Sequence, residues 1–142
     1  PEQKFMNSMQ ALHLFDEQQR LYCGQGHPLY RVPDHSITSG MLETHPFVGR
    51  TYMSATEICG LKFNLNAETS QMESAAALIS SGRYLGFLPV HFAQLWEGKG
   101  LIRGIRPDTV FFNDLFFAVR NKSGTNLVAE KFVKCLELAV VL

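Results

Sequence analysis

The chain has 142 residues, enough for one domain with its own hydrophobic core. Hydrophobic residues make up 46% and charged residues 18%, and this composition excludes intrinsic disorder. Thirteen basic and thirteen acidic residues give a net charge of zero, so charge gives no indication of a nucleic-acid surface. No apolar run approaches the length of a membrane span, and no signal-peptide pattern is visible at the start of the sequence.

The N-terminal part is expected to begin with two short strands, at residues 10–15 and 20–24. The acidic pair Asp16 and Glu17 between them predicts a turn. Residues that break regular structure follow, namely Gly24, Gly26, Pro28 and Pro33. They are the clearest boundary signal in the sequence.

Beyond that boundary, helical and extended patterns alternate. We expect one helical turn at residues 38–42, a buried strand at 46–49 and another strand at 64–68. Ser54 and Glu57 have capping-box spacing and predict a short helix that begins at Ala55.

The clearest predicted helix covers residues 70–81, with Met72, Ala75, Ala76 and Ile79 on one face. A second capping box, from Ser70 to Glu73, is expected to begin it, and Gly82 is expected to end it. The continuous apolar run at 84–88 is typical of a strand covered on both faces.

Four more elements complete the chain. They are a helix at 90–97 with Phe92, Leu95 and Trp96 on one face, strands at 101–105 and 110–120, and a helix at 126–140. The last helix carries an apolar stripe formed by Val128, Phe132, Cys135, Leu136 and Ala139.

The alternation of strand and helix predicts an α/β fold with βαβ units and a parallel sheet. The two ends differ from this pattern and are expected to form part of a second subdomain, with segments 21–24 and 115–120 as paired crossings. Two N-terminal strands cannot cover the stripe of the last helix, because a lone ribbon is marginal in water. We therefore expect that part of the fold is missing or is supplied by a second copy, so that the chain self-associates.

The sequence contains no recognisable catalytic or cofactor motif: GxSxG, Walker A, GxGxxG after a strand, HExxH and paired CxxC are all missing. The five histidines are scattered, and Cys23, Cys59 and Cys135 stand far apart, as reduced thiols of a cytosolic protein do. We expect no catalysis, no metal and no cofactor.

One position has a clear physical use. At the predicted helix start, Thr69, Ser70 and Gln71 offer free backbone N–H groups and the positive end of a helix dipole, which attract anions. Arg50 follows a strand, and ligands of open α/β sheets bind at the carboxyl ends of strands. The alternatives are that Ser70 is only a helix cap and that Arg50 is a solvated loop residue.

Four segments, taken in order, resemble the effector-binding domain of LysR-type transcriptional regulators. LFDEQQRLYCGQGHPL (14–29) resembles that family's strand–turn–strand, and HPFVGR (45–50) the first strand of its second subdomain. ALISSGRYLGFLP (77–89) is similar to the helix end, turn and apolar strand, and LFFAVRNKSGTNLVAEKFVKCL (115–136) to the returning strand and final helix. Tyr84 departs from the family, which has a glycine at that place.

The resemblance implies a bacterial sensor domain of periplasmic-binding-protein-like fold, in which a small effector lies between two subdomains. It assigns residues 1–30 to a remnant of the first subdomain and a crossing strand, 31–112 to a complete second subdomain, and 113–142 to the return strand and C-terminal helix of the first. It also implies a fragment without the helix-turn-helix, so that DNA would be bound only through that missing part. The implied effector-binding residues are Gly49, Arg50, Thr69, Ser70, Gln71, Phe87 and Pro89.

The leading interpretation is a cytoplasmic, homo-oligomeric sensor of a small, polar or anionic effector, without catalysis and without a membrane. A solute-binding protein of a transport system has the same architecture and is the alternative. A small α/β enzyme is the third class, but the sequence shows no pair of nucleophile and base.

Overall fold

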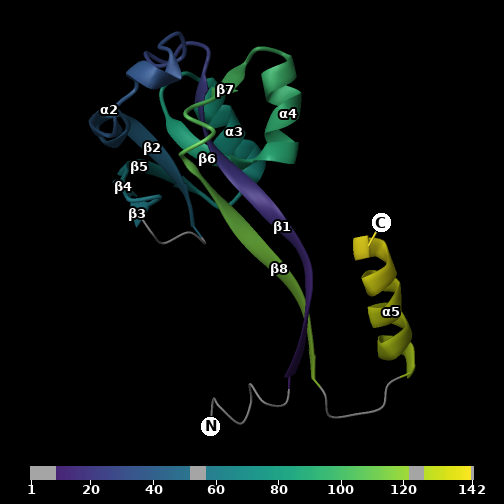
Figure 1. The fold of residues 1–142 in the computed structure, drawn as a ribbon. Helices are drawn as coiled ribbons and strands as arrows, with labels where there is room; N and C mark the ends of the chain where they lie inside the picture. Colours follow the sequence, from purple (N-terminus) through teal and green to yellow (C-terminus); the bar gives the residue numbers. More distant parts are fainter. Residues whose placement is uncertain (1–8, 52–56, 122–126, 142) are drawn as a thin grey trace. The chain divides into compact units, whose positions relative to one another are not determined.

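The computed structural model describes residues 9–51, 57–121 and 127–141. Two compact units divide the chain: a central unit, Gln18–Asn113, and a terminal unit, formed by Pro1–Glu17 together with Asp114–Leu142. The central unit begins at Gln18. The subdomain bounds that the resemblance implies, with the second subdomain at residues 31–112, stay a prediction. Figure 1 shows the elements of both units.

The elements follow in chain order. They are β1 (Met9–Gly24), the 3-10 turn η1 (Asp34–Ser36), α2 (Ser39–Thr44), β2 (Pro46–Arg50), β3 (Glu57–Ile58), β4 (Leu61–Lys62), β5 (Asn64–Thr69), α3 (Met72–Ser80), β6 (Leu85–Pro89), α4 (Val90–Gly98), β7 (Ile102–Gly104), β8 (Phe111–Asn121) and α5 (Leu127–Val141).

The main sheet has the strand order β5-β2-β6-β1-β7, and β8 also pairs with β1. β2 runs parallel to β5 and to β6, as the βαβ pattern predicted, whereas β1 runs antiparallel to β6 and β7. β3 and β4 form a separate hairpin whose turn residues, Cys59 and Gly60, both have positive φ angles.

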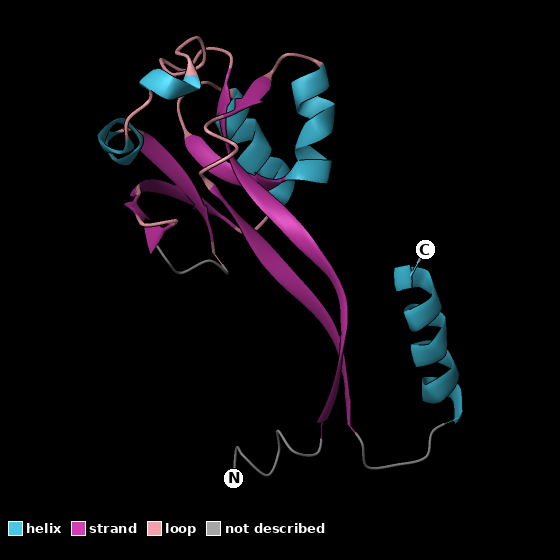
Figure 2. Ribbon diagram, viewed as in Figure 1, coloured by secondary structure: helices cyan, strands magenta, loops and turns pink. Residues whose placement is uncertain are grey.

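Alternate side chains of the sheet build two cores, one on each face. Tyr22, Val48 and Leu88 pack with Ala75, Ala76 and Ile79 of α3 and with Ala93 of α4. Their sequence neighbours Leu21, Phe47 and Phe87 belong to the other core, which the loops, α2 and the hairpin complete. Figure 2 shows α3 and α4 together on one face of the sheet.

A half-buried cation, Arg103, organises the turns between β1 and α2. The Arg103 guanidinium in β7 donates hydrogen bonds to the backbone carbonyls of Tyr30 at 2.7 Å, Leu29 at 3.1 Å and Val32. It also forms an ion pair with Asp34 at 2.9 Å. These contacts hold the irregular segment between β1 and α2, which is rich in glycine and proline, in a single conformation.

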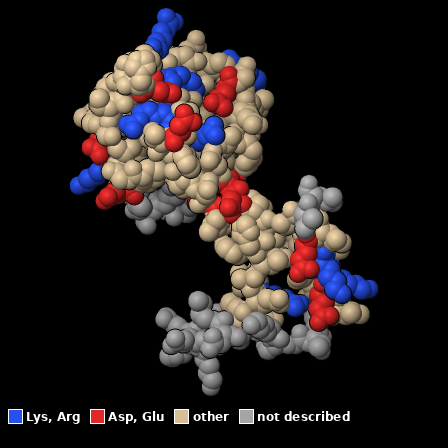
Figure 3. All heavy atoms as spheres, in the orientation of Figure 1, with Lys and Arg blue, Asp and Glu red and all other residues tan. Residues whose placement is uncertain are grey.

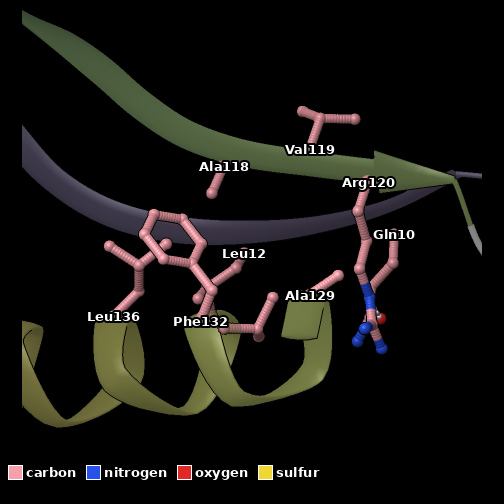
Figure 4. A pocket seen from close by; sticks show the side chains of 9 residues that line it. Gln10, Leu12, Ala118, Val119, Arg120, Ala129, Phe132 and Leu136 are labelled. Atoms are coloured by element: carbon pink, nitrogen blue, oxygen red, sulfur yellow. Dashed lines mark hydrogen bonds between the residues drawn. The ribbon is translucent and has the colours of Figure 1, made fainter. Parts of the chain in front are cut away.

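In the terminal unit, α5 packs against the ribbon that β1 and β8 form. Ala129, Val133 and Leu136 are half-buried on the helix side that lines an apolar groove, and Leu12 and Ala118 line it from the ribbon. Figure 4 shows this groove, where Arg120 Nε donates to Gln10 Oε1 at 2.8 Å. The predicted stripe is nevertheless largely exposed.

Its exposure is clear from two residues: Val128 is 76% exposed and Phe132 63%. The described part of the chain therefore does not cover the stripe, as the sequence led us to expect. Among the described residues, no helix is long and apolar enough to cross a membrane.

Several elements agree with their predictions, including α2, β2, β5, β6, β7, β8 and α5. The turn at Asp16 and Glu17 is wrong, because β1 continues through both residues as one strand. An acidic pair favours exposure but does not require a positive φ angle, and here Asp16 bonds to His13 at 2.6 Å along the strand.

Two predicted helix starts also differ. The capping box before α3 is wrong: β5 stays paired with β2 up to Thr69, so the helix begins only at Met72, with Gln71 as N-cap. Ser54 and Ala55 lie outside the described residues, and Glu57 belongs to strand β3. In α4, Leu95 is 66% exposed, so the buried face consists of Phe92, Ala93 and Trp96.

Candidate functional site: the carboxyl ends of β2, β5 and β6

Three neighbouring parallel strands end at one edge of the central sheet. The register between β2 and β5 pairs Gly49 with Glu68 and Arg50 with Thr69. Thr69, Ser70 and Gln71 lead directly into α3, so the structure brings Arg50 and the α3 start together, as the sequence indicated. This is the edge at which open α/β sheets bind ligands.

Arg50 places a positive charge at this edge while remaining 7% exposed. A buried guanidinium is tolerated only where it has partners, and it attracts a further anion more strongly than a solvated one does. Among the predicted effector residues, Arg50 is the one with a charged side chain, and that charge favours a negatively charged ligand.

The α3 start has an open geometry. Thr69 Oγ1 accepts a hydrogen bond from the Gln71 backbone N–H at 3.2 Å, which fixes the turn between β5 and α3. No side chain caps the helix, and Ser70 and Gln71 are exposed. The first backbone N–H groups of α3 thus remain available to an acceptor from outside.

The other three predicted residues lie in the interior of the same edge. Gly49 is buried, and a Cβ there would come within 2.8 Å of Leu65 Cδ1. Phe87 is 3% exposed and packs against the rings of Phe63 and Phe112, at 5.6 and 5.1 Å between centroids. The structure thus places Phe87 in the aromatic core and not at an accessible surface.

Pro89 ends β6 and is fully buried as the N-cap of α4. Opposite it in the register of β1 lies Gln19, which is 1% exposed and which the sequence analysis missed. Its position directly before the predicted strand at 20–24 was the available signal, but the expected turn at Asp16 and Glu17 concealed it.

Other chemistry is limited in the described residues. Among them, no group of three or more His, Cys, Asp or Glu side chains could hold a metal ion. Burial raises the pKa of the Cys23 thiol to about 12, which removes its nucleophilic character. The apolar groove of the terminal unit and a shallow depression around Arg106 and Asp108 contain none of the predicted effector residues.

Charge on the central unit gives no basic surface in the view of Figure 3, where Lys and Arg are interspersed with Asp and Glu. That face offers no footprint of the kind that phosphate backbones select. The edge formed by β2, β5 and β6 remains the strongest candidate site in the described part of the chain.

A relative with a described role is similar to this chain in sequence. The HTH-type transcriptional activator BauR of Pseudomonas aeruginosa is 29% identical over 137 residues, which cover 94% of this chain and 45% of BauR. The chain therefore spans less than half the length of that relative.

Solved structures share the fold. The apo regulatory domain of HypT from Salmonella typhimurium superposes with a TM-score of 0.71 at 18% identity, over 94% of this chain and 66% of that one. The regulatory domain of CcmR from Synechocystis PCC6803, solved in complex with 2-PG, gives 0.72 at 12% identity, over 94% and 67%.

The expected periplasmic-binding-protein-like α/β fold is thereby confirmed, since these neighbours are LysR regulatory domains. A family model described as the LysR substrate binding domain matches residues 3–139. The chain belongs to the family of LysR substrate binding domains.

Proposed function

We propose that this chain is the effector-sensing domain of a LysR-type transcriptional regulator and that its effector is a small, polar or anionic molecule. The observation that carries the proposal is the pairing of Arg50 with Thr69 at the carboxyl ends of β2 and β5. It joins a buried positive charge to an uncapped helix start, and both favour a carboxylate or phosphate group.

Each site residue has a role in this proposal. Arg50 attracts the anion, and the backbone N–H groups after Gln71 donate hydrogen bonds to it, with the Ser70 hydroxyl beside them. Gly49 leaves room between β2 and Leu65, and Phe87 and Pro89 fix the apolar wall behind the edge.

The proposal extends to the setting of the domain. Any contact with operator DNA belongs to a helix-turn-helix segment and not to these 142 residues, and the sensor works in the cytoplasm as a homo-oligomer. No reaction is part of its role. The match to regulators supports this function over solute capture for transport.

Thermal unfolding in the presence of a panel of small carboxylates and phosphates tests the proposal. A ligand that binds only the folded state raises its stability by about 2.7 kcal/mol at a hundredfold excess over Kd. We expect at least one anion to raise the midpoint in the wild type and to have a much smaller effect on Arg50→Gln.

Two further variants separate binding from folding. Met72→Pro removes the first backbone N–H after Gln71, at the first helical position, where proline is tolerated, and leaves Arg50 in place. Arg106→Gln removes a half-buried arginine elsewhere in the central unit. The first variant should weaken binding of the same anion and the second should not. An anion that stabilises Arg50→Gln and Met72→Pro as strongly as the wild type would contradict this site.

A further inference from the structure

The groove between α5 and the β1–β8 ribbon combines apolar walls with a single charge. Its lining residues come from β1, β8 and α5, and all of them belong to the terminal unit. Among the described residues that line it, Arg120 is the one with a charged side chain. An apolar cleft with a few placed polar groups is the usual composition of a small-molecule site.

The apolar wall runs along α5. Ala129, Phe132 and Leu136 follow one another at helical spacing and form a row on one side of the helix. Figure 4 shows this row facing Leu12 and Ala118 of the ribbon. From Ala129 to Leu136 the helix rises by about 10 Å, at ~1.5 Å per residue. The row therefore has the length of a medium-sized hydrocarbon chain.

The free space in the groove is of the right size for such a chain. Its volume is about 130 Å³. An apolar cavity of ~150 Å³ holds a benzene molecule, so the groove has room for several carbon atoms. Phe132 lines the groove and is still 63% exposed, so a chain that lies over its ring removes apolar surface of both partners from water.

Arg120 stands at one end of the groove and is half-buried. Its Nε donates a hydrogen bond to Gln10 Oε1 at 2.8 Å, which holds the guanidinium in place without neutralising it. In the described part of the chain, no Asp or Glu carboxylate forms an ion pair with Arg120. Its two Nη groups therefore keep their donors for an anion.

The single guanidinium also selects the kind of anion. A carboxylate matches its charge and accepts hydrogen bonds from it in planar geometry, whereas a doubly charged phosphate is better matched by two cations. The lysines of α5, Lys131 and Lys134, are exposed and are not among the described residues that line the groove. The geometry thus favours a carboxylate with one negative charge.

We propose that this groove binds a medium-chain monocarboxylate, with its carboxylate on Arg120 and its aliphatic chain along Phe132 and Leu136. The groove contains none of the residues of the effector site in the central unit, so it is a second ligand site that does not depend on the proposed function. Such a ligand covers part of the α5 stripe that the described chain leaves exposed.

Isothermal titration calorimetry of the 142-residue chain with octanoate tests the proposal. We expect saturable binding of one octanoate per chain. Shortening the probe to hexanoate should raise the Kd by about fourfold for each methylene lost, because each buried methylene contributes to affinity. Octylamine has the same chain and the opposite charge, and its Kd should be at least about tenfold higher than that of octanoate.

Three variants locate the site. Arg120→Gln should raise the octanoate Kd at least about tenfold through the loss of a charge-assisted hydrogen bond, and Arg120→Lys, which keeps the charge, should restore part of the affinity. Ala118→Phe fills the groove opposite Phe132 and should weaken octanoate as well; it replaces Arg120→Gln should that variant fail to fold by circular dichroism. Arg106→Gln, the matched control, removes a half-buried arginine of the central unit and should bind octanoate like the wild type.

An absence of saturable octanoate binding, or folded Arg120→Gln and Ala118→Phe variants that bind it like the wild type, would overturn the proposal. Binding that is lost in Arg50→Gln but kept in Arg120→Gln would place octanoate at the effector site of the central unit; it would overturn this inference and leave the proposed function standing. A dimer in sedimentation velocity that takes up no octanoate would show that a second copy occupies the groove and would overturn it too.

Discussion

Arg103 is expected to contribute more to the stability of the central unit than any other surface-accessible arginine, because its guanidinium holds the turns from Leu29 to Asp34. Replacing it with Ala removes hydrogen bonds to three backbone carbonyls of these turns, a further one to the Gly104 carbonyl, and the ion pair with Asp34. A hydrogen bond to a charged group contributes ~1.5–3 kcal/mol, but these bonds share one group and do not add.

The ion pair itself counts for little. The Arg103 and Asp34 side chains are 26% and 40% exposed, and solvent-exposed pairs contribute ~0.2–1 kcal/mol. We therefore expect Arg103→Ala to lower the free energy of unfolding by about 3 kcal/mol, mostly through the carbonyls. Asp34→Asn should lower it by about 0.5 kcal/mol.

Arg103→Lys separates the contribution of the planar guanidinium geometry from that of its positive charge. An ammonium group keeps the charge but cannot reach carbonyls in three directions with planar geometry. It should recover no more than about half of the loss. Urea unfolding followed by Trp96 fluorescence measures these differences as shifts of the midpoint at constant m. A loss below ~1 kcal/mol for Arg103→Ala would refute the view that the guanidinium organises these turns.

Three further predictions concern the central unit and the thiols. Gly24→Ala should destabilise the chain by about 2 kcal/mol, because a Cβ there would lie 2.3 Å from the Ile79 carbonyl oxygen, whereas Gly98→Ala, with open space around it, should be neutral or slightly stabilising in the same urea titration. Burial, with His45 beside it, lowers the pKa of His27 from 6.5 to about 4, so the unfolded state takes up the proton first. Stability should fall by up to about 3 kcal/mol as the pH drops from 6.5 toward 4, and His27→Gln should flatten this dependence; an unchanged slope would contradict it. A coloured disulfide reagent should modify Cys135 fast, Cys59 more slowly because burial raises its pKa, and Cys23 only on unfolding; a rapid third thiol in the native chain would count against the buried position of Cys23.

Much of the fold could be predicted because periodicity and burial agree in the middle of the chain. The apolar run before Pro89 became β6, buried at every position, and the stripe from Met72 to Ile79 became α3. Such elements follow from local pattern, since one face or both must be removed from water.

The errors arise where tertiary pairing overrides a local signal. Ser70 and Glu73 have the spacing of a capping box, but the ladder between β5 and β2 holds Thr69 extended and delays the helix to Met72. Asp16 and Glu17 carry a turn signal, but β1 continues through both residues as one long strand that belongs to both units.

The candidate site divides in the same way. Arg50 and Thr69 could be placed together because parallel strands end at a common edge, which is a topological argument. The sequence could not show whether Phe87 lines the ligand site or is buried in the core, because its burial depends on Phe63 and Phe112 from distant segments. Gln19 was missed, because only the register of β1 against β6 brings it opposite Pro89.

The division of the chain also sets an order of folding. The central unit is one continuous segment, whereas the terminal unit joins residues before Gln18 to residues after Asn113. During synthesis, the N-terminal half of β1 therefore remains unpaired until β8 leaves the ribosome. Closing an unstructured loop of this length costs about 4 kcal/mol of chain entropy. A central unit that has already folded avoids this cost, because it holds β1 and β8 next to each other. The central unit behaves as a domain inserted into another, and segment 18–113 should fold alone, whereas the terminal segments should remain unfolded without it.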